Sequence, residues 1–460
     1  MTSVSILLAE HVARSRFEVL PGSAIAAAKT SILDAIGVSL AAGGLGEGCA
    51  AFIDLASESG PGPSTVLGAG FKAQPLMAAL ANGAMAHALD YEDAYDGAPI
   101  HPNAAVVPAA LALAEARDAT GKQLIAAVAV GADLVCRLGL CLTENPDRYG
   151  WYPPPILGAF GAAAACANLL GLTAAQTLDA FALTLSQATS SSQFKQSPLS
   201  HVRAVRDAFA AHAGLLAAVL ASKGVLGFAE PFEGKAGLFQ LYARGAYDPA
   251  RLTQDLGLVF EGANVSYKIW PACRGTHAFI QAALELTEQE PIALERIRSI
   301  RATGGEIQRM LAEPHAQKAQ PKTAIDAKFS IPFTVATALV HGRVDLAAFQ
   351  PSALSDPAVL SLAGRCRYVC APASHDSLID STGGLLELEL TDGRVLSRRI
   401  DHPRGHPSDP VGLDELRRKF VDCAGYARTP LASSCAEQGF DAVMSLEHRD
   451  VRPVIAGLSI

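Results

Sequence analysis

The sequence predicts a mainly α-helical protein in which a large multihelical domain, built from both ends of the chain, carries an inserted α+β domain. Alanine- and leucine-rich runs with apolar residues three and four positions apart fill the first half of the chain. Near Ser266 strand-like segments replace these runs, and helical patterns return close to the C-terminus. We therefore expect a helical domain over residues 1–266 and 405–460, and an α+β domain over residues 267–404.

The helical domain is predicted from a series of apolar runs whose joints are marked by glycine and proline. Small alanine side chains let neighbouring helix axes approach closely, so these runs indicate tight helix–helix packing. The expected helices span residues 24–41, 75–88, 104–116, 124–142, 160–170, 174–188 and 202–222. After the inserted domain, residues 414–423 and 436–446 are expected to complete it.

The inserted domain contains both strand-like and helix-like sequence patterns. Residues 385–390 and 394–400 flank Thr391-Asp392-Gly393, a sequence typical of a β-hairpin turn. Further strands are expected over residues 296–303 and 367–370, and helices over 278–288 and 332–341.

Composition narrows the class of protein. Of the 460 residues, 50% are hydrophobic and 18% are charged, which favours a folded globular chain over a disordered one. The net charge of −8 argues against a nucleic-acid partner, which would select for a basic surplus. The N-terminus lacks the basic and apolar regions of a signal peptide. Apolar stretches such as residues 157–170 look too short to span a bilayer. We therefore expect a soluble, cytoplasmic protein without a membrane partner.

The nine cysteines are scattered, odd in number and without any Cys-x-x-Cys pair. This pattern favours buried free thiols in a reducing compartment. It argues against an iron–sulfur cluster or a structural zinc site.

Titratable side chains are densest between His87 and His101. This segment carries two histidines, three aspartates, a glutamate and two tyrosines in an alanine-rich region. Such groups are costly to bury, so their clustering marks a candidate site. If the helix that starts at Pro75 continues through Tyr91, then His87, Asp90 and Tyr91 share one face. Hydrogen bonding at a helix end is the structural alternative. A metal site is allowed by the residue types, but no diagnostic spacing supports it.

Three further segments combine charged or aromatic residues. Residues 267–277, at the predicted domain junction, carry a lysine, an arginine and a histidine that could bind carboxylates or move protons. The alternative is that this segment is an ordinary surface turn. The aromatics of residues 149–152 favour packing between elements. Arg203 and Arg206 open a predicted helix and would suit a di- or tricarboxylate, although a solvated helix face is the simpler explanation.

Taken in order, these segments resemble the MmgE/PrpD family, which includes 2-methylcitrate dehydratases, cis-aconitate decarboxylases and iminodisuccinate epimerase. Five ordered motifs carry the resemblance over nearly the whole chain. They are AHALDY (86–91) with His101-Pro102, LGAFGAA (157–163), KIWPACRGTH (268–277), DAKFSIP (326–332) and PRGHP (403–407).

The resemblance implies a helical domain with an α+β lid, a homodimer and a cleft between the domains. It also implies metal-independent acid–base chemistry, without a cofactor, on a small polycarboxylate substrate. Asp93, His101, Lys268 and His277 match active-site positions of the family.

Two positions depart from the family pattern. Its dehydratases and decarboxylases usually carry a histidine in a Gly-aromatic-His-Pro motif, where this chain has Tyr152. They also carry a lysine ahead of a Gly/Ala-rich helix, where an ungapped match places Arg203. The reference pKa of tyrosine is about 10, against about 6.5 for histidine, so Tyr152 would be a different acid–base partner. Arginine stays charged and clamps carboxylates but does not shuttle protons.

The reactions of the family share the formation or protonation of a carbanion next to a carboxylate, which needs a base and nearby cations. Because the usual histidine and lysine are absent, our leading hypothesis is an epimerase or isomerase of the iminodisuccinate-epimerase type. The alternatives are a hydro-lyase of the 2-methylcitrate dehydratase type, with Tyr152 assisting departure of hydroxide, and a cis-aconitate-type decarboxylase. A catalytically inactive carboxylate-binding member is a third possibility. The expected catalytic residues are Asp93, His101, Tyr152 and Lys268, and the expected substrate-binding residues are Arg203, His277, Arg274 and Cys273.

Overall fold

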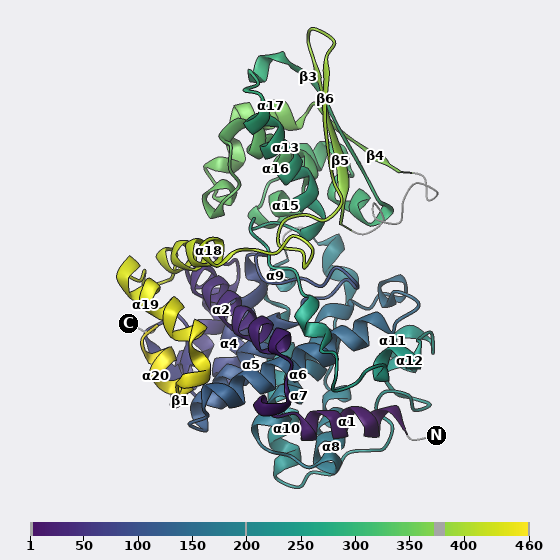
Figure 1. Ribbon diagram of the computed structural model, residues 1–460, viewed down its shortest axis with the longest axis vertical. Helices are drawn as coiled ribbons and strands as arrows, with labels where there is room; N and C mark the ends of the chain where they lie inside the picture. Colours follow the sequence, from purple (N-terminus) through teal and green to yellow (C-terminus); the bar gives the residue numbers. More distant parts are fainter. Residues whose placement is uncertain (1–2, 198–199, 372–381, 459–460) are drawn as a thin grey trace. The chain divides into compact units, whose positions relative to one another are not determined.

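The computed structural model describes residues 3–197, 200–371 and 382–458, which divide into two compact units (Figure 1). Unit 1 comprises Met1–Val265 and Gly412–Ile460, and unit 2 comprises Ser266–Val411. Unit 1 is helical apart from one small hairpin, and unit 2 holds the larger sheet. The predicted mainly α fold with an embedded α+β region is confirmed.

Unit 2 ends at Val411, whereas the sequence analysis placed the end of the inserted domain at residue 404. The backbone N–H of Tyr267 donates to the carbonyl of Gly405 over 3.1 Å. The guanidinium of Arg274 donates to the carbonyls of Pro403 and Arg404 over 3.1 and 3.0 Å. These bonds hold the segment around Gly405 in unit 2.

Unit 1 is a bundle of alanine-rich helices. Its α-helices are α1 (Val4–Arg14), α2 (Gly22–Leu45), α3 (Cys49–Glu58), α4 (Pro75–Ala88), α5 (Asn103–Ala116), α6 (Gly121–Leu140), α7 (Pro153–Leu169), α8 (Ala174–Leu185), α9 (Val202–Val205), α10 (Asp207–Ser222), α11 (Leu238–Ala243), α12 (Pro249–Thr253), α18 (Leu413–Gly425), α19 (Ser433–Met444) and α20 (Val451–Ala456). Its 3-10 turns are η1 (Phe17–Val19), η2 (Pro146–Tyr149), η3 (Ser192–Gln196), η4 (Glu261–Asn264) and η10 (Leu446–His448).

The centre of unit 1 is formed by α4, α5, α6, α7 and α10. Helix α7 packs against α5, α6 and α10, and α10 also packs against α4. Two glycines permit these close crossings. A Cβ atom on Gly161 of α7 would lie 2.8 Å from the carbonyl oxygen of Gly131 on α6, and one on Gly214 of α10 would lie 2.5 Å from that of Ala159 on α7. The helix axes therefore approach until backbone meets backbone.

The C-terminal helices fold back onto the N-terminal part of unit 1. Helix α18, coloured yellow, lies beside α2, coloured purple, and α19 packs on both (Figure 1). Residues from the two ends of the chain thus share one core, as the sequence indicated.

A small hairpin in unit 1 was missed by the sequence analysis, which placed only a joint there. Strands β1 (Pro61–Val66) and β2 (Phe71–Ala73) pair antiparallel. Buried side chains from helices hold them: Glu115 accepts from the backbone N–H of Thr65 over 2.6 Å, and Asn82 accepts from that of Leu67 over 3.0 Å. These partners are distant in sequence, so the local pattern does not reveal the strands.

Helix α4 has the predicted bounds and does not continue through Tyr91. It ends at Ala88, and Asp90 adopts a left-handed backbone conformation with φ of 50°. The N–H of Asp90 donates to the carbonyl of His87 over 2.7 Å and closes the turn. The condition under which His87, Asp90 and Tyr91 would share a helical face is therefore not met.

Unit 2 contains a four-stranded sheet in the order β4-β3-β5-β6. Strands β3 and β4 are parallel and the other pairs are antiparallel. Alternate residues of β5 are buried, and the sheet packs against α13 through β5 and β6. The strands are β3 (Ile297–Gly304), β4 (Cys366–Cys370), β5 (Gly384–Leu390) and β6 (Val395–Ile400). The helices and 3-10 turns are η5 (Arg274–Thr276), α13 (His277–Gln289), η6 (Leu294–Arg296), η7 (Glu306–Leu311), α14 (His315–Ala319), α15 (Ala324–Lys328), α16 (Ile331–His341), η8 (Leu346–Phe349), η9 (Ala353–Ser355) and α17 (Pro357–Ala363).

The four predicted strands and the hairpin turn of unit 2 are all present. Gly393 has φ of 86°, which only glycine adopts readily, so the turn between β5 and β6 depends on it. The nine cysteines are free and most are buried, as predicted.

Among the residues that the structure describes, three helical stretches are long and apolar enough, by length and composition alone, to cross a membrane, which the sequence analysis did not expect. The most apolar windows of these stretches are 72%, 89% and 72% buried in the structure. The stretches are Gly22–Leu45, Gly121–Leu140 and Val202–Ser222.

The helix crossing at Gly214 provides a stability test. We expect Gly214→Ala to destabilise unit 1 by about 1–3 kcal/mol, because the new methyl group would press against the α7 backbone. Urea unfolding followed by circular dichroism measures the change. The control is Gly425→Ala on α18, where a Cβ meets nothing within 4 Å. Equal effects of the two substitutions would contradict the close crossing.

Candidate active site

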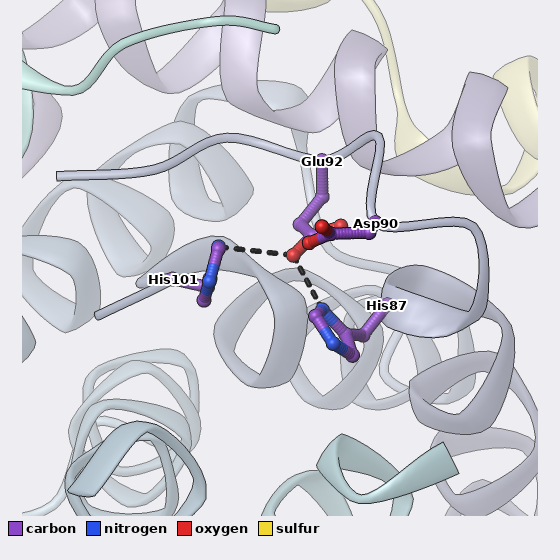
Figure 2. Close-up of side chains that lie close together, drawn as sticks. All are labelled: His87, Asp90, Glu92 and His101. Carbon is purple, nitrogen blue, oxygen red and sulfur yellow. Dashed lines mark hydrogen bonds and ion pairs between the residues drawn. The ribbon is translucent and has the colours of Figure 1, made fainter. Parts of the chain in front are cut away.

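The segment between α4 and α5 forms the centre of the candidate site. After the turn at Asp90 the chain runs out and returns, because the N–H of Tyr95 donates to the carbonyl of Ile100 over 3.1 Å. This return brings His101 back toward Glu92 (Figure 2). Asn103 then starts α5. The acids and His101 are thus carried by a loop with both ends fixed on buried helices, and His87 lies in the last turn of α4.

One glutamate carboxylate joins the two histidines. Oε1 of Glu92 lies 2.5 Å from Nδ1 of His87 and 3.0 Å from Nδ1 of His101 (Figure 2). Nδ1 of His101 is also 2.8 Å from the backbone oxygen of Asp93. The side chains of His87 and Glu92 are each 1% exposed, whereas that of His101 is 16% exposed. His101 is therefore the solvent-accessible end of a buried network.

Asp93 is a buried carboxyl group with an unusual titration. Its Oδ2 accepts a 2.6 Å hydrogen bond from Asn103, whose Nδ2 is also 2.9 Å from Oγ of Ser31. Its Oδ1 has no hydrogen-bond partner among the residues that the structure describes. Burial raises the pKa of Asp93 to about 7, the negative charge of Asp34 adds to the rise, and the bond from Asn103 opposes it. A carboxyl that titrates near neutral pH can give or take a proton.

Helix α18 supports this loop from the C-terminal end of the chain. Nζ of Lys419 donates to Oδ1 of Asp34 over 2.6 Å and to the backbone oxygen of Tyr91 over 2.8 Å. The ammonium group also lies 3.9 Å from the centre of the Tyr91 ring. Lys419 therefore ties the loop to α2.

Arg206 lies between α9 and α10 and is buried against the histidine pair. Its Nη1 hydrogen-bonds Nε2 of His87, and its Nε is 3.3 Å from Oδ2 of Asp207. Burial, followed by the positive charge of Arg206, lowers the pKa of His87. The sequence suggested that Arg203 and Arg206 act as a pair on one face, but Arg206 is directed to His87, and Arg203 lies 5.9 Å from the Phe194 ring.

Tyr152 lies directly before α7 and contacts two cationic groups through its ring. The centre of the ring is 5.0 Å from the guanidinium of Arg206 and 4.9 Å from Nζ of Lys195. It also packs edge-on against Phe194, with ring centres 4.9 Å apart. Lys195 was not picked out by the sequence analysis, because it lies in a polar loop without a motif.

An open cavity of about 640 Å³ lies in unit 1 beside these residues. Its polar lining includes Ser190, Ser191, Gln193 and Arg206, and its apolar lining includes Phe194 and Phe209. One cationic group among hydroxyl and amide groups suits a small anionic ligand.

The remaining predicted residues lie in unit 2. Lys268 and His277 are buried, and the His277 ring packs on Trp270 with centres 5.2 Å apart while its Nε2 is 3.0 Å from the carbonyl of Ala272. Cys273 is half-buried, and its backbone N–H donates to the carbonyl of Lys328. Arg274 holds the backbone of residues 403–404, as described above. Contact of these four residues with substrate stays a prediction.

Glu92 and three neighbouring side chains have the types and spacing of a metal site. Their ligand atoms all lie within 4.8 Å of one another and belong to His87, Asp90, Glu92 and His101 (Figure 2). A cation there would face the buried guanidinium of Arg206 through the His87 ring, and this like charge disfavours metal binding. The types and spacing of the four residues thus suit a cation, while the neighbouring guanidinium opposes its charge.

The chain combines a helical unit that holds a buried acid–base network with an α+β unit. This combination is typical of an enzyme that works by acid–base chemistry. Residues 7–249 match the MmgE/PrpD N-terminal domain, and residues 270–437 match the MmgE/PrpD C-terminal domain. The chain therefore belongs to the MmgE/PrpD family of enzymes.

Named relatives cover most of the chain. It is 29% identical over 426 residues to the cis-aconitate decarboxylase-like protein oryM of Aspergillus oryzae, covering 86% of this chain and 85% of the relative. It is 27% identical over 413 residues to the cis-aconitate decarboxylase of Mus musculus, covering 85% and 80%. It is 25% identical over 426 residues to the 2-methylcitrate dehydratase of Cupriavidus necator, covering 88% and 87%. Their names describe a decarboxylase-like protein, a decarboxylase and a dehydratase, and none an epimerase.

Ionisation of Asp93 should weaken the fold as the pH rises. The pKa is about 7 in the folded protein and about 3.9 in an unfolded chain, so stability present at low pH is lost between about pH 4 and pH 7. Asp93→Asn keeps the bond from Asn103 and removes the charge. We expect it to reduce the loss of unfolding free energy between pH 5 and pH 8 by about 1 kcal/mol or more.

Urea unfolding at the two pH values measures this difference. Asp54→Asn, at an exposed aspartate paired with Arg428, is the control and should leave the pH dependence unchanged. If Asp93→Asn has the same pH dependence as the unsubstituted protein, Asp93 is already ionised at pH 5.

Proposed function

We propose that this chain is a lyase that acts next to a carboxylate of a small di- or tricarboxylate, with decarboxylation of a cis-aconitate-type acid as the first candidate reaction. The observation that carries the proposal is the placement of Asp93 and His101 in one loop. Asp93 is a buried carboxyl with a pKa near 7, and His101 is an imidazole at the exposed end of a buried network. The two provide an acid and a base within one site.

In this reaction the bond between the leaving carboxylate and its neighbouring carbon breaks. Carbon dioxide departs, and the electron pair remains on the substrate, where cationic groups stabilise the negative charge. A proton donor then completes the product. Asp93 in its protonated form is the proposed donor, with His101 as the second acid–base group. Tyr152 and Lys268 are further candidates for proton transfer.

Carboxylate binding is proposed for the predicted residues Arg203, His277, Arg274 and Cys273. An arginine binds a carboxylate through parallel N–H donors and keeps its charge at every working pH.

Decarboxylation is placed first because the cis-aconitate decarboxylase-like relative reaches 29% identity and a cis-aconitate decarboxylase reaches 27%, against 25% for the dehydratase of Cupriavidus necator. Dehydration of a 2-methylcitrate-type acid is the second candidate, with Tyr152 assisting departure of hydroxide. Epimerisation remains a hypothesis based on the absence of the usual histidine and lysine, and none of these relatives supports it.

Turnover in deuterated water distinguishes the three reactions. Cis-aconitate, 2-methylcitrate and succinate-type acids are each incubated with the protein and followed by NMR. We expect carbon dioxide release and one deuterium in the product from cis-aconitate. Loss of water without carbon dioxide would identify a dehydratase. Exchange of an α-proton for deuterium without loss of water or carbon dioxide would identify an epimerase. Absence of all three signals overturns the proposal.

Asp93→Asn and His101→Gln should each lower kcat by about 10²–10⁴-fold, the usual contribution of a positioned acid or base. His341→Gln, at an exposed histidine of unit 2 paired with Asp356, serves as the control and should retain full activity. Normal kcat in Asp93→Asn would remove Asp93 from the chemistry.

The pH profile tests which way Asp93 transfers its proton. As a donor Asp93 must be protonated, so kcat/KM should fall about tenfold per pH unit above about pH 7. Steady-state rates between pH 5 and pH 9 measure this profile. A limb that rises through pH 7 would instead make Asp93 the base.

A further inference from the structure

We propose that Arg206, His87 and Glu92 are positioning residues that hold the proton of His101 on Nδ1 and leave Nε2 as the atom that exchanges a proton with the substrate. Since this inference concerns proton transfer by His101, it rests on the proposed function. It assigns a purpose to three buried residues that the predicted catalytic set leaves out.

The direction of each hydrogen bond follows from what its partners can do. A guanidinium only donates, so Nε2 of His87 accepts from Nη1 of Arg206. A neutral imidazole that accepts at Nε2 carries its proton on Nδ1. That nitrogen is 2.5 Å from Oε1 of Glu92 and therefore donates to it. The other guanidinium contact, between Nη2 and Nδ1 of His87, is longer at 3.3 Å.

The same reasoning assigns the proton of His101. Its Nδ1 faces Oε1 of Glu92 at 3.0 Å and the backbone oxygen of Asp93 at 2.8 Å. A carboxylate and a carbonyl both accept, so Nδ1 must donate and must carry a proton. In the neutral ring Nε2 then holds the lone pair that can take up a proton.

The charges around the network favour this arrangement. Arg206 is positive, and Glu92 and Asp207 are negative. Burial and then the charge of Arg206 lower the pKa of His87, which favours its neutral form. When Nε2 of His101 takes a proton, the Glu92 carboxylate beside Nδ1 stabilises the imidazolium. The other acids of the cluster are Asp34, Asp90 and Asp93.

The exposure of the four side chains shows which of them a substrate can reach. Arg206 is 2% exposed, and the side chains of His87 and Glu92 are each 1% exposed. Only the His101 end reaches 16% exposure. A substrate can therefore meet this network at His101, while the three residues behind it act through that ring.

Nitrogen NMR reads the tautomers directly. The protein is labelled with ¹⁵N-histidine, and the His87 and His101 signals are assigned from their loss in His87→Gln and His101→Gln. At pH 8.5, where free histidine is neutral, we expect Nδ1 protonated and Nε2 unprotonated in both rings. Arg206→Met should redistribute the His87 proton between its two nitrogens. A proton on Nε2 of His101 in the unsubstituted protein overturns the inference.

Steady-state kinetics measure how much Glu92 and His87 contribute to kcat. Glu92→Gln should lower kcat about 10²-fold or more and leave KM within about threefold, because the carboxylate acts on the reacting imidazole and not on substrate binding. His87→Gln should lower kcat less. The Glu92→Gln/His87→Gln double variant should be no slower than Glu92→Gln alone, because the residues act as one unit.

Glu115→Gln is the matched control, since Glu115 is another buried glutamate of unit 1 that holds the β1–β2 hairpin. It should retain the kcat of the unsubstituted protein. Equal losses of kcat in Glu92→Gln and Glu115→Gln, or additive losses in the double variant, would contradict the inference. If the unsubstituted protein turns over none of the acids, the proposed function fails, whereas the NMR result still decides the tautomers.

Discussion

The candidate site depends on a single carboxylate that is removed from water and shared by two imidazoles. A glutamate as buried as Glu92 would be costly without compensation. Here His87 and His101 both approach its Oε1, and the guanidinium of Arg206 lies behind His87. The loop after α4 must therefore fold back so that His101 reaches the carboxylate. This requirement explains why the chain turns sharply at Asp90 and why both ends of the loop are fixed on buried helices.

Much of the fold could be predicted because its signals are local. Alanine and leucine periodicity located the main helices, and the Thr391-Asp392-Gly393 turn located the β5–β6 hairpin. The features that were missed depend on distant partners. The β1–β2 hairpin relies on Glu115 and Asn82, which lie on helices further along the chain.

The site shows the same division. Motif resemblance pointed to Asp93 and His101, which the structure places in one loop. It did not point to Glu92, although its position next to Asp93 in a cluster of acids was a usable signal. Arg206 was noticed as half of an arginine pair, but its direction toward His87 depends on how α10 packs against α4, which spacing along one helix does not contain. Tyr152 and Lys195 meet because the backbone before α7 pairs with the backbone before η3, where the N–H of Tyr152 donates to the carbonyl of Ser190.

The contact between Lys419 and the loop has a consequence for biosynthesis. Lys419 lies on α18, which is made after the whole of unit 2, yet it holds the backbone of Tyr91 and the carboxylate of Asp34. During translation the N-terminal helices are synthesised before unit 2 and α18, so they lack the contacts of Lys419 until α18 has been made. The nascent helical unit therefore has to remain soluble without its last three helices, and a ribosome that stops within unit 2 leaves a chain whose acid–base loop cannot be locked in place.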